Sequence, residues 1–454
     1  MPEHLHFIGI GGIGMSGIAK LAAGCGLIVS GSDLKRTKIT DELENLGVRI
    51  YLGHAEDNIS GADTVVYSSA IKKDNPEFLG AIKNNIPLIK RAEALARLMR
   101  DKSVITVTGS HGKTTTTSLI YCILLESGLS PTAAVGGILH NIGTNACIGT
   151  GEFFVAAADE SDGSFLYYRP KYSVITNIDR EHLDYYKDFE KEKSAFGEFL
   201  KLTREDGCIF ACYDDANLRE MLKTTAIRRV FFGLDDQSDI YPQDVWLDGL
   251  TCEFNCYYKG KLLERFSLPL GGMHNISNSL AAIAVGLELG IALPVIKRAL
   301  AGFKGTGRRI EVKFRSNDYI IIDDYAHHPT EIKATLAAVK NLKPHNRLIA
   351  VFQPHRYSRT QLLLEDFARS FDLADYLIIT DIYAASETPI PGVEGRSIYE
   401  KIKKYAPDKE LYFLRKEEIL PHLLKNIRSG DIVATLGAGD IIKVCDELVG
   451  RLKS

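Results

Sequence analysis

Basic residues are not in excess in this sequence. Lys and Arg number 55 against 58 Asp and Glu, so the formal net charge at pH 7 is −3. Proteins that follow DNA or RNA backbones usually carry a basic excess, because their Lys and Arg side chains neutralise phosphates. We therefore expect no nucleic acid among the partners of this chain.

Long hydrophobic runs are also missing. The most apolar N-terminal stretch, residues 5–29, is interrupted by glycines and contains Lys20, and no basic segment precedes it. Elsewhere no uncharged apolar run reaches the roughly 18 residues of a membrane-spanning helix. The sequence thus predicts a cytoplasmic protein without membrane insertion.

Cysteine is scarce, with eight residues in a chain of 454. The two close pairs, Cys208/Cys212 and Cys252/Cys256, have no His or Cys cluster beside them that would complete a zinc site. We interpret the cysteines as reduced core residues of a protein in a reducing compartment.

The remaining composition is that of a globular protein, with 45% hydrophobic and 25% charged residues. At about 150 residues per domain, the length suggests three domains. Strand-like and helix-like stretches alternate along the chain, and this alternation restarts twice. It predicts an α/β protein with mainly parallel sheets flanked by helices, with domain boundaries at 1–100, 101–305 and 306–454.

The expected elements follow this alternation. The strands are predicted at 5–10, 27–30, 48–51, 64–67, 87–89, 104–107, 153–157, 173–176, 319–323, 348–352, 376–380, 411–413 and 431–436. The helices are predicted at 15–23, 41–46, 76–84, 115–126, 276–289, 332–339 and 361–371. Residues 228–268 alternate between apolar and polar positions with a period of two, which indicates a small antiparallel patch.

A glycine loop follows the first predicted strand. Gly9, Gly11 and Gly14 match the G-x-G-x-x-G pattern between a strand and a helix, and Gly12 is a further glycine in the loop. Such a loop lets a phosphate approach the helix N-terminus. Asp33 lies 19 residues beyond Gly14, where a dinucleotide-binding fold places its ribose-binding acid. The N-terminal domain is therefore expected to be Rossmann-like, and on this motif alone an NAD-linked oxidoreductase stays open.

A second glycine loop, Thr108–Thr115, opens the middle domain. Gly109 and Gly112 have two residues between them, where the usual phosphate loop has four. Lys113 supplies positive charge for the β- and γ-phosphates, and the Thr114 hydroxyl is a suitable Mg²⁺ ligand. The loop predicts a central domain that resembles P-loop ATPases and binds ATP with Mg²⁺.

Acidic residues follow the next two strands of the middle domain. Asp159, Glu160 and Asp162 come directly after one strand, and Asp179 and His182 come after the following strand. The carboxyl ends of parallel strands lie at one edge of a sheet, where ligands bind. Together with the second glycine loop, these residues predict a magnesium site.

The C-terminal domain, also expected to be Rossmann-like, has two polar clusters at strand ends, 323–330 and 353–360. Arg356 and Arg359 are three residues apart, so at a helix start they would share one face. A guanidinium pair there can bind carboxylate or phosphate.

On these motifs the sequence resembles the Mur ligase family over nearly its whole length. It is most similar to the branch that adds the first amino acid of the peptidoglycan stem. The motifs that carry the resemblance are Gly9–Gly17, Ser30–Asp33, Thr108–Thr117, Ala158–Asp162, Thr176–Asp184, Met273–Asn275, Asp324–Thr330 and Gln353–Thr360.

The resemblance implies a reaction and its substrates. Members of that branch use ATP and Mg²⁺ to join L-alanine to the lactyl carboxylate of UDP-N-acetylmuramate through an acyl phosphate, a step of peptidoglycan precursor synthesis. A sister ligase that attaches a preformed tripeptide to the same sugar nucleotide is the alternative within the family. Nothing in the sequence indicates an oligomeric state.

The resemblance also implies roles for individual residues. For the UDP-sugar they are Gly9, Gly11, Gly12, Gly14, Ser32 and Asp33. For ATP they are Gly109, Ser110, His111, Gly112, Lys113, Thr114, Thr115, Asn275, Arg309 and Asp324. For catalysis they are Lys113, His182, His327, Arg356 and Arg359, the last three near the incoming amino acid and the transferred phosphate.

One position departs from the family pattern. Similar enzymes hold magnesium with a Glu where this sequence has Ala157, in addition to the residues matching Thr114 and His182. Either Glu160 or Asp159 supplies the missing oxygen, directly or through a water, or the metal site is weaker. Of the two acids we favour Glu160, because its side chain reaches farther.

Overall fold

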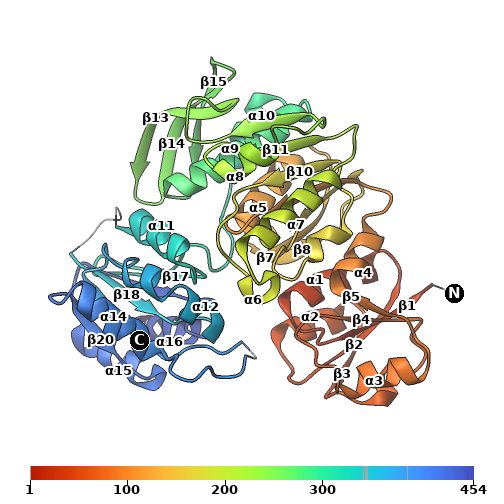
Figure 1. Cartoon of the computed structure of the whole chain (residues 1–454), viewed down its shortest axis with the longest axis horizontal. Coiled ribbons are helices and arrows are strands. Elements are labelled where there is room, and N and C mark those ends of the chain that lie inside the picture. Colours follow the sequence, from red (N-terminus) through yellow and green to blue (C-terminus); the bar gives the residue numbers. More distant parts are fainter. Residues whose placement is uncertain (1, 341, 343–345, 386, 454) are drawn as a thin grey trace. The chain divides into compact units, whose positions relative to one another are not determined.

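The computed structural model describes residues 2–340, 342, 346–385 and 387–453. Three stretches of the chain build sheets of five, ten and six strands, shown from red to blue in Figure 1. The expected α/β fold with three mainly parallel sheets flanked by helices is confirmed.

By compactness the chain divides into two units. One comprises the residues up to Tyr241 with Tyr258–Lys261 and Asn278–Leu300, and the other comprises Pro242–Tyr257, Leu262–Ser277 and the residues from Ala301 on.

The N-terminal sheet has the strand order β3-β2-β1-β4-β5, and its pairings are parallel. The strand order reverses at β1, so the loop that follows β1 lies at a topological switch point, where such sheets bind ligands. The elements are β1 (His4–Ile8), α1 (Ile13–Gly24), β2 (Ile28–Asp33), α2 (Lys38–Asn45), β3 (Arg49–Leu52), the 3₁₀ helix η1 (Glu56–Ile59), β4 (Thr64–Tyr67), α3 (Pro76–Lys83), β5 (Leu88–Lys90) and α4 (Arg91–Leu98).

The middle sheet has the order β15-β14-β13-β12-β11-β10-β6-β9-β7-β8, with β6 between β10 and β9. The elements are β6 (Ser103–Thr108), α5 (Lys113–Glu126), β7 (Thr132–Leu139), β8 (Thr144–Cys147), β9 (Phe153–Ala157), η2 (Ser164–Tyr167), β10 (Tyr172–Ile175), α6 (Leu183–Tyr186), α7 (Phe189–Lys201), β11 (Cys208–Cys212), α8 (Ala216–Met221), β12 (Arg229–Phe232), β13 (Ile240–Asp248), β14 (Thr251–Tyr258), β15 (Lys261–Leu268), α9 (Met273–Glu288) and α10 (Leu293–Ala301). The ends of β6, β9 and β10 carry the glycine loop and the acidic residues.

The C-terminal sheet has the order β16-β17-β21-β18-β19-β20, with only β16 antiparallel to its neighbour. The elements are β16 (Glu311–Arg315), β17 (Tyr319–Asp324), α11 (Pro329–Val339), β18 (Leu348–Phe352), α12 (Tyr357–Leu362), α13 (Leu364–Ala368), β19 (Tyr376–Ile379), α14 (Gly395–Tyr405), β20 (Glu410–Phe413), α15 (Lys416–Asn426), β21 (Asp431–Leu436) and α16 (Ile442–Lys453).

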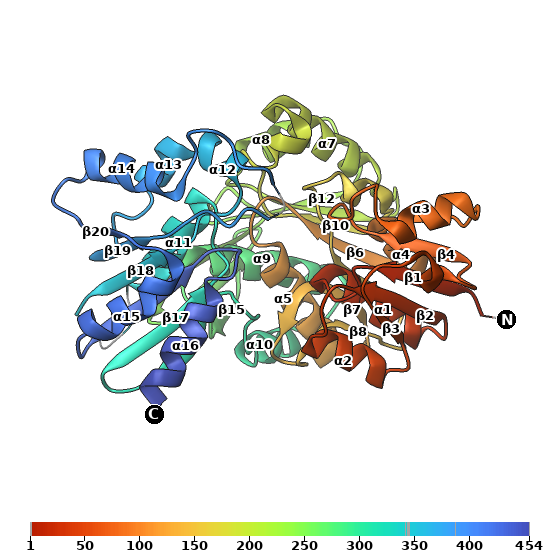
Figure 2. The same cartoon turned by 90° about the horizontal axis from the view of Figure 1, so that it is seen from below.

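Alternating residues of the C-terminal strands feed two separate cores. Ile320 and Ile322 of β17 pack with α11, α13 and α14, whereas Ile321 packs with α15 and α16. Successive side chains of a strand point to opposite faces, so a strand that is apolar throughout is covered on both sides. Figure 2 shows α13 and α14 on one side of this sheet and α15 and α16 on the other.

Most predicted elements occur within a few residues of their predicted bounds, and three predictions need correction. The helix predicted at 361–371 is two short helices, α12 and α13, which meet at Leu363. The first strand ends at Ile8, because Gly9 turns the chain with a φ of 74°. Strand β12, inside the predicted antiparallel patch, pairs parallel with β11.

The antiparallel part of the predicted patch is β13–β15. Two residues connect β13 to β14 and two connect β14 to β15, and such short links join only antiparallel neighbours. In the second link, Lys259 and Gly260 have φ values of 48° and 76°, as a tight hairpin turn requires.

Among the described residues, no helix is long and apolar enough to cross a membrane.

The close packing of β2 against the loop after β1 makes a testable prediction. A Cβ added to Gly31 would lie 2.6 Å from the Phe7 carbonyl oxygen and 2.6 Å from Ile10 Cδ1. Gly31→Ala should therefore lower the free energy of unfolding by about 1–3 kcal/mol. The matched control is Gly197→Ala, where a Cβ meets nothing within 4 Å. In α7 that change should stabilise by up to ~1 kcal/mol. Equal melting temperatures for Gly31→Ala and the unchanged protein would contradict the packing argument.

Candidate active site

The first glycine loop is held by the end of β2. The N–H groups of Gly9 and Ile10 donate to the Ser32 carbonyl oxygen at 2.8 and 2.9 Å. The Gly11 N–H donates to the Asp33 carboxylate at 2.9 Å. These donors are therefore used within the protein, and an anion at this loop would meet the N–H groups of the first turn of α1. That turn contains no acidic residue, which leaves the positive end of the helix dipole uncompensated.

Ser32 and Asp33 make hydrogen bonds within the protein that fix the loop and that the sequence did not suggest. The buried Ser32 hydroxyl donates to Glu77 Oε2 at 2.5 Å and lies 2.9 Å from His54 Nδ1. Burial alone would raise the pKa of Glu77, but interactions with His6 and then with Ser32 and Asn58 outweigh it and lower the pKa of that carboxyl. Glu77 is thus a buried anion that fixes the loop through Ser32. Contact of Ser32 or Asp33 with a sugar nucleotide stays a prediction.

The second glycine loop lies between β6 and α5 and is closely packed. Gly109 and Gly112 have φ values of 128° and 83°. A Cβ at Gly109 would lie 2.2 Å from Thr176 Oγ1, and one at Gly112 would lie 2.5 Å from Asn278 Oδ1. Both positions therefore require glycine on conformational and steric grounds.

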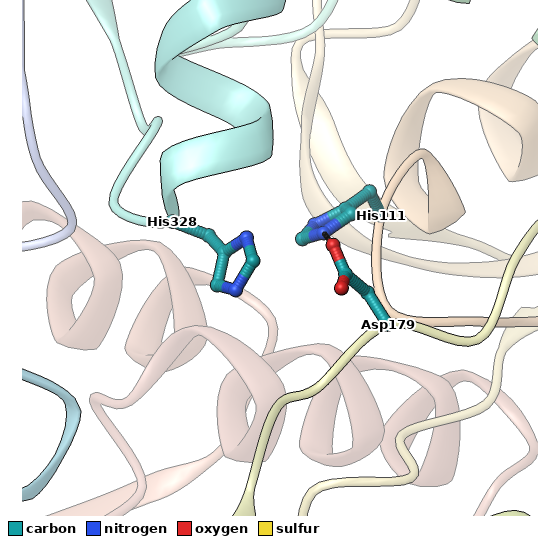
Figure 3. A group of neighbouring side chains, drawn as sticks. All are labelled: His111, Asp179 and His328. Carbon is teal, nitrogen blue, oxygen red and sulfur yellow. Dashed lines mark hydrogen bonds and ion pairs between the residues drawn. The ribbon is translucent and has the colours of Figure 1, made fainter. Parts of the chain in front are cut away.

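The end of β10 supports the same loop from the side. The Ser110 N–H donates to the Asn177 carbonyl oxygen at 3.1 Å, and the His111 N–H donates to Asn177 Oδ1 at 2.9 Å. The His111 ring lies 3.0 Å from the Asp179 carboxylate through Nε2 (Figure 3). Asn177 was not singled out in the sequence, although its place directly after a strand is the signal that identified Asp179.

Lys113, the first residue of α5, turns back over the loop. Its ammonium group donates to the carbonyl oxygens of Gly109 and Ser110 at 2.5 and 3.1 Å and to Glu160 Oε1 at 2.7 Å. Burial alone would lower the pKa of Lys113, but the Glu160 and Asp159 carboxylates raise it above its ordinary value. The lysine therefore stays charged inside the loop.

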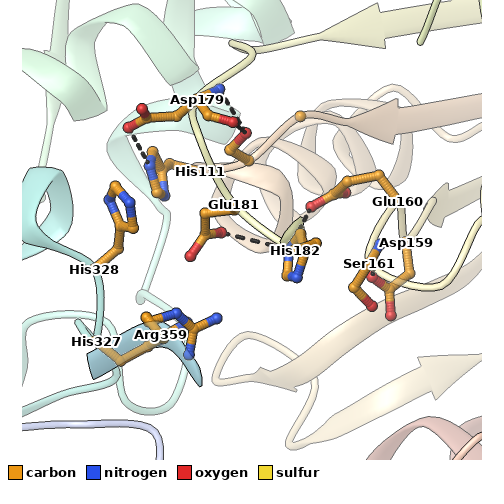
Figure 4. Close-up of polar contacts among 12 residues, drawn as sticks. His111, Asp159, Glu160, Ser161, Asp179, Glu181, His182, His327, His328 and Arg359 are labelled. Atoms are coloured by element: carbon orange, nitrogen blue, oxygen red, sulfur yellow. Dashed lines mark hydrogen bonds and ion pairs between the residues drawn. The ribbon is translucent and has the colours of Figure 1, made fainter. Parts of the chain in front are cut away.

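Glu160 brings Lys113 and His182 together. His182 Nε2 lies 3.3 Å from Glu160 Oε1 and 3.5 Å from Glu181 Oε2 (Figure 4). Burial opposes the charge on His182, yet the two carboxylates raise its pKa. The Tyr186 hydroxyl donates to the Glu160 carbonyl oxygen and so fixes the turn that carries this acid.

The residues present fit a divalent cation beside Thr114. Glu160 is fully buried, and its Oε2 has no hydrogen-bond donor among the described residues. An ideal Cβ at Gly136 would lie 3.9 Å from Thr114 Oγ1 and 3.7 Å from the Ala157 methyl, so Thr114 and Ala157 flank the same space. Hydroxyl and carboxylate oxygens are suitable ligands for magnesium, which keeps several waters.

Asp159 is the weaker replacement for the family's metal-binding Glu. Its carboxylate pairs with Arg91 Nη2 at 2.5 Å and accepts the Ser161 N–H. Burial would raise the pKa of Asp159, but the charges of Arg91, Lys113 and His182 hold it well below its usual range. Glu160 pairs with Lys113 and His182 through Oε1 and keeps Oε2 without a donor among the described residues, whereas both oxygens of Asp159 have partners.

In the C-terminal domain Asp324 ends β17 in a fully buried position. Its carboxylate accepts the N–H groups of Ile310 and Ala326 at 2.6 and 2.7 Å. Burial raises its pKa to about 6, and the Arg309 charge opposes this rise. Arg309 Nη1 lies 3.5 Å from Glu331. Arg309 and Asp324, predicted as ATP contacts, are thus brought together.

His327 and Asn275 also lie among polar groups of this unit. His327 Nδ1 lies 2.9 Å from the Tyr325 carbonyl oxygen, so Nδ1 carries the proton, because a carbonyl can only accept. In the neutral ring the lone pair is then on Nε2. Asn275 Nδ2 donates to the Gly271 carbonyl oxygen at 2.8 Å.

The prediction that Arg356 and Arg359 share a helix face is wrong. Arg356 precedes α12 with a φ of 71°, outside helical geometry, and its N–H donates to the Tyr383 carbonyl oxygen. Arg359 lies within α12, and its Nη1 is 3.1 Å from His355 Nδ1. The positive φ at Arg356 begins the helix one residue later than the spacing suggested.

Glu192 is a buried acid that the sequence analysis missed. It lies on α7 one turn before Phe196, on the buried face that continues to Phe199. Its side chain is fully buried, and neither carboxylate oxygen has a hydrogen-bond donor among the described residues. The sequence contained a sign of this burial, because Glu192 occupies a position on the apolar face of an amphipathic helix.

Burial raises the pKa of Glu192 to about 8. His182 opposes the rise, and the carboxylates of Glu160 and Glu181 add to it. The folded protein therefore keeps a proton on Glu192 that the unfolded chain releases near pH 4.5. Between these two pH values a rising pH favours unfolding, and above about pH 8 the destabilisation is complete.

Replacing Glu192 should remove this pH dependence. In metal-free buffer, the unfolding free energy of Glu192→Gln should exceed that of the unchanged protein at pH 8.5 by on the order of 3 kcal/mol more than at pH 5. Thermal melts from pH 5 to 9 measure the difference. Glu190→Gln, an exposed position of the same helix, is the control and should follow the unchanged protein. Parallel pH profiles for Glu192→Gln would show that the acid is not neutral in the fold.

Three family models match the chain in order. They are described as Mur ligase family, catalytic domain, over residues 4–103; Mur ligase middle domain, over 107–286; and Mur ligase, glutamate ligase domain, over 308–439. Together the matches cover most of the sequence, with one match for each sheet.

Curated relatives match over nearly their full length. The chain is 49% identical to a UDP-N-acetylmuramate–L-alanine ligase of Desulfatibacillum aliphaticivorans, over 97% of this chain and 96% of that protein. It is 47% identical to the protein of the same name from Geotalea uraniireducens (strain Rf4), over 99% and 98%.

Solved structures agree with the fold. The crystal structure of UDP-N-acetylmuramate-alanine ligase from Thermotoga maritima superposes with a TM-score of 0.84 at 31% identity, over 99% of both chains. A murein peptide ligase from Psychrobacter arcticus 273-4 superposes with a TM-score of 0.74 at 24% identity, over 99% and 98%. The second likeness shows the fold alone.

Proposed function

Because this chain belongs to the Mur ligase family, we propose that it joins L-alanine to the lactyl carboxylate of UDP-N-acetylmuramate with hydrolysis of ATP. The relatives at 49% and 47% identity bear the name of this activity. The structural observation that carries the proposal is the ammonium group of Lys113, held charged within a glycine loop by Glu160. An NAD-linked oxidoreductase has no use for this loop.

The two glycine loops divide the substrates between them. ATP lies along Gly109–Thr115, where the N–H groups at the start of α5 and Lys113 meet its phosphates. The sugar nucleotide lies with its diphosphate at the start of α1, which Ser32 and Asp33 hold in place through the loop backbone. Further nucleotide contacts that the resemblance implies are Asn275 in α9 and, in the C-terminal domain, Arg309 and Asp324.

The reaction needs activation, because a carboxylate does not react with an amine in water. The lactyl carboxylate attacks the γ-phosphorus of ATP, ADP leaves, and the amine of alanine then attacks the acyl phosphate and releases phosphate. Lys113 offsets the negative charge that gathers where the carboxylate meets the phosphates. Thr114, His182 and Glu160 would hold a magnesium ion, which supplies further positive charge at the transferring group.

The amine must lose a proton before it attacks. We assign this to the His327 Nε2 lone pair, which the hydrogen bond between Nδ1 and the Tyr325 carbonyl oxygen makes available in the neutral ring. Arg356 and Arg359 hold the carboxylate of alanine or the transferred phosphate.

The cytoplasm is the compartment we propose, since all eight cysteines are free thiols.

Phosphate release tests the proposed reaction directly. Release from ATP should require both UDP-N-acetylmuramate and an amino acid, with L-alanine preferred over L-serine and glycine. Preference for a preformed tripeptide would assign the chain to the sister ligase. Release from ATP alone, unchanged by either substrate, would show a nucleotide hydrolase and contradict the proposal.

Lys113→Ala should abolish ligation. Loss of a preorganised charge at the transferring phosphate costs on the order of 3 kcal/mol, or ~10²-fold or more in kcat. Ligation is measured as phosphate release with all three substrates. Lys223→Ala, an exposed ion pair in the same unit, is the control and should keep full activity. More than half of the original rate in Lys113→Ala would rule out the assigned role.

Ala157→Glu should strengthen divalent-cation binding. The new carboxylate would enter the space that Ala157 shares with Thr114. A carboxylate that contacts magnesium directly is a better ligand than a water that a neighbouring acid holds in place. Mn²⁺ binding followed by electron paramagnetic resonance, with ATP present, should tighten about tenfold. The Mg²⁺ concentration for half-maximal activity should fall in parallel. Ala157→Gln matches the size without the charge and should gain little; an equal gain would point to packing as the cause.

A further inference from the structure

Arg91 lies between the first glycine loop and the acidic residues that follow β9. It is the first residue of α4, and its Nη2 donates to Asp159 at 2.5 Å. The other edge of its guanidinium faces α1, since a Cβ on Gly14 would lie 2.6 Å from Arg91 Nη1. Among the described residues this contact with Asp159 is the only hydrogen bond of the Arg91 side chain. The donors on the α1 side therefore have no acceptor in the part of the chain that the structure describes.

The charges around Arg91 favour an anion on that side. The guanidinium lies at the positive end of the α1 dipole, and two positive groups repel one another unless an anion lies between them. Asp159 does not supply this anion alone, because Lys113 and His182 also act on its carboxylate. Burial opposes the charge of Arg91, but Asp159 and then Asp162 raise its pKa, so the guanidinium stays charged.

A small cavity opens at this place. It has a volume of about 70 Å³, and its lining is mostly apolar, with Ile18, Leu95 and Val135 among the apolar residues and Arg91 and Asp159 as its charged ones. That volume admits one small group or a few waters and is too small for a whole sugar. The cavity runs along the side of α1, past Gly14, Gly17 and Ile18, toward Ala157, and the Arg91 side chain lines it near the first turn of that helix.

We propose that Arg91 binds the diphosphate of the sugar nucleotide at the start of α1, with Asp159 as the positioning residue that holds its guanidinium. The proposal rests on the proposed function, which places a sugar nucleotide at this loop. A planar guanidinium can serve both partners at once, one edge on a carboxylate and the other on a phosphate. Lysine has a single donor centre and cannot reproduce this arrangement.

Binding measurements on the full chain separate the diphosphate from the rest of the ligand. By isothermal titration calorimetry, Arg91→Gln should weaken UDP-N-acetylmuramate and UDP about tenfold or more, and Arg91→Lys should weaken both severalfold. Uridine should bind all variants equally, because it has no phosphate. ATP affinity should stay unchanged, which also shows that each variant is folded.

Two further variants sharpen the comparison. Gly14→Ala should weaken UDP as Arg91→Gln does, because the methyl group displaces Nη1. Arg97→Gln removes a guanidinium from the same helix at an exposed pair with Glu93 and should bind UDP as the unchanged protein does. If Arg91→Gln binds UDP within twofold of the unchanged protein, or loses uridine as strongly as UDP, the inference about Arg91 is wrong. If the unchanged protein binds no UDP-N-acetylmuramate, the proposed function itself fails.

Discussion

The contact between Lys113 and Glu160 is the constraint on which the site depends. Burial opposes the charge of Lys113, and the carboxylate of Glu160, 2.7 Å away with its side chain fully buried, raises the lysine's pKa against that effect. The same Glu160 oxygen lies 3.3 Å from His182, so one acid orients the phosphate-loop cation and a candidate metal ligand. Substrate phosphates therefore meet charges that are already in place, which is the condition for electrostatic catalysis without reorganisation.

The N-terminal and middle domains hold their glycine loops in the same way. Each places a glycine loop between a central strand and a helix, and each fixes that loop from the end of a neighbouring strand. In the first, Ser32 and Asp33 at the end of β2 accept loop N–H groups. In the second, Asn177 after β10 does so. The first loop lacks a lysine of its own, and Arg91 from α4 supplies the positive charge there. Two anionic substrates can thus be bound by two glycine loops, each with a cationic side chain beside it, within one unit of the chain.

Residues next to strand ends could be predicted from the sequence, because their place follows from the parallel sheet. Gly109, Lys113, Glu160 and His182 are examples, and the structure brings them together as expected. Arg91 and Glu77 could not be predicted as readily, because each lies on a helix whose burial depends on packing far along the chain. Arg356 shows a third kind of difference, in which one residue with positive φ lies before the helix and not within it. The sequence spacing of two residues predicts that they share a helix face only where both lie within the regular helix.

The central claim is that the lactyl carboxylate is activated as an acyl phosphate at the Lys113 loop. It is tested most directly with UDP-N-acetylmuramate labelled with ¹⁸O in that carboxylate, turned over with ATP and L-alanine, followed by mass analysis of the released phosphate. The account predicts that each released phosphate carries one oxygen from the carboxylate, because amine attack breaks the bond between the acyl carbon and that oxygen. Unlabelled phosphate, or ¹⁸O in AMP, would contradict it.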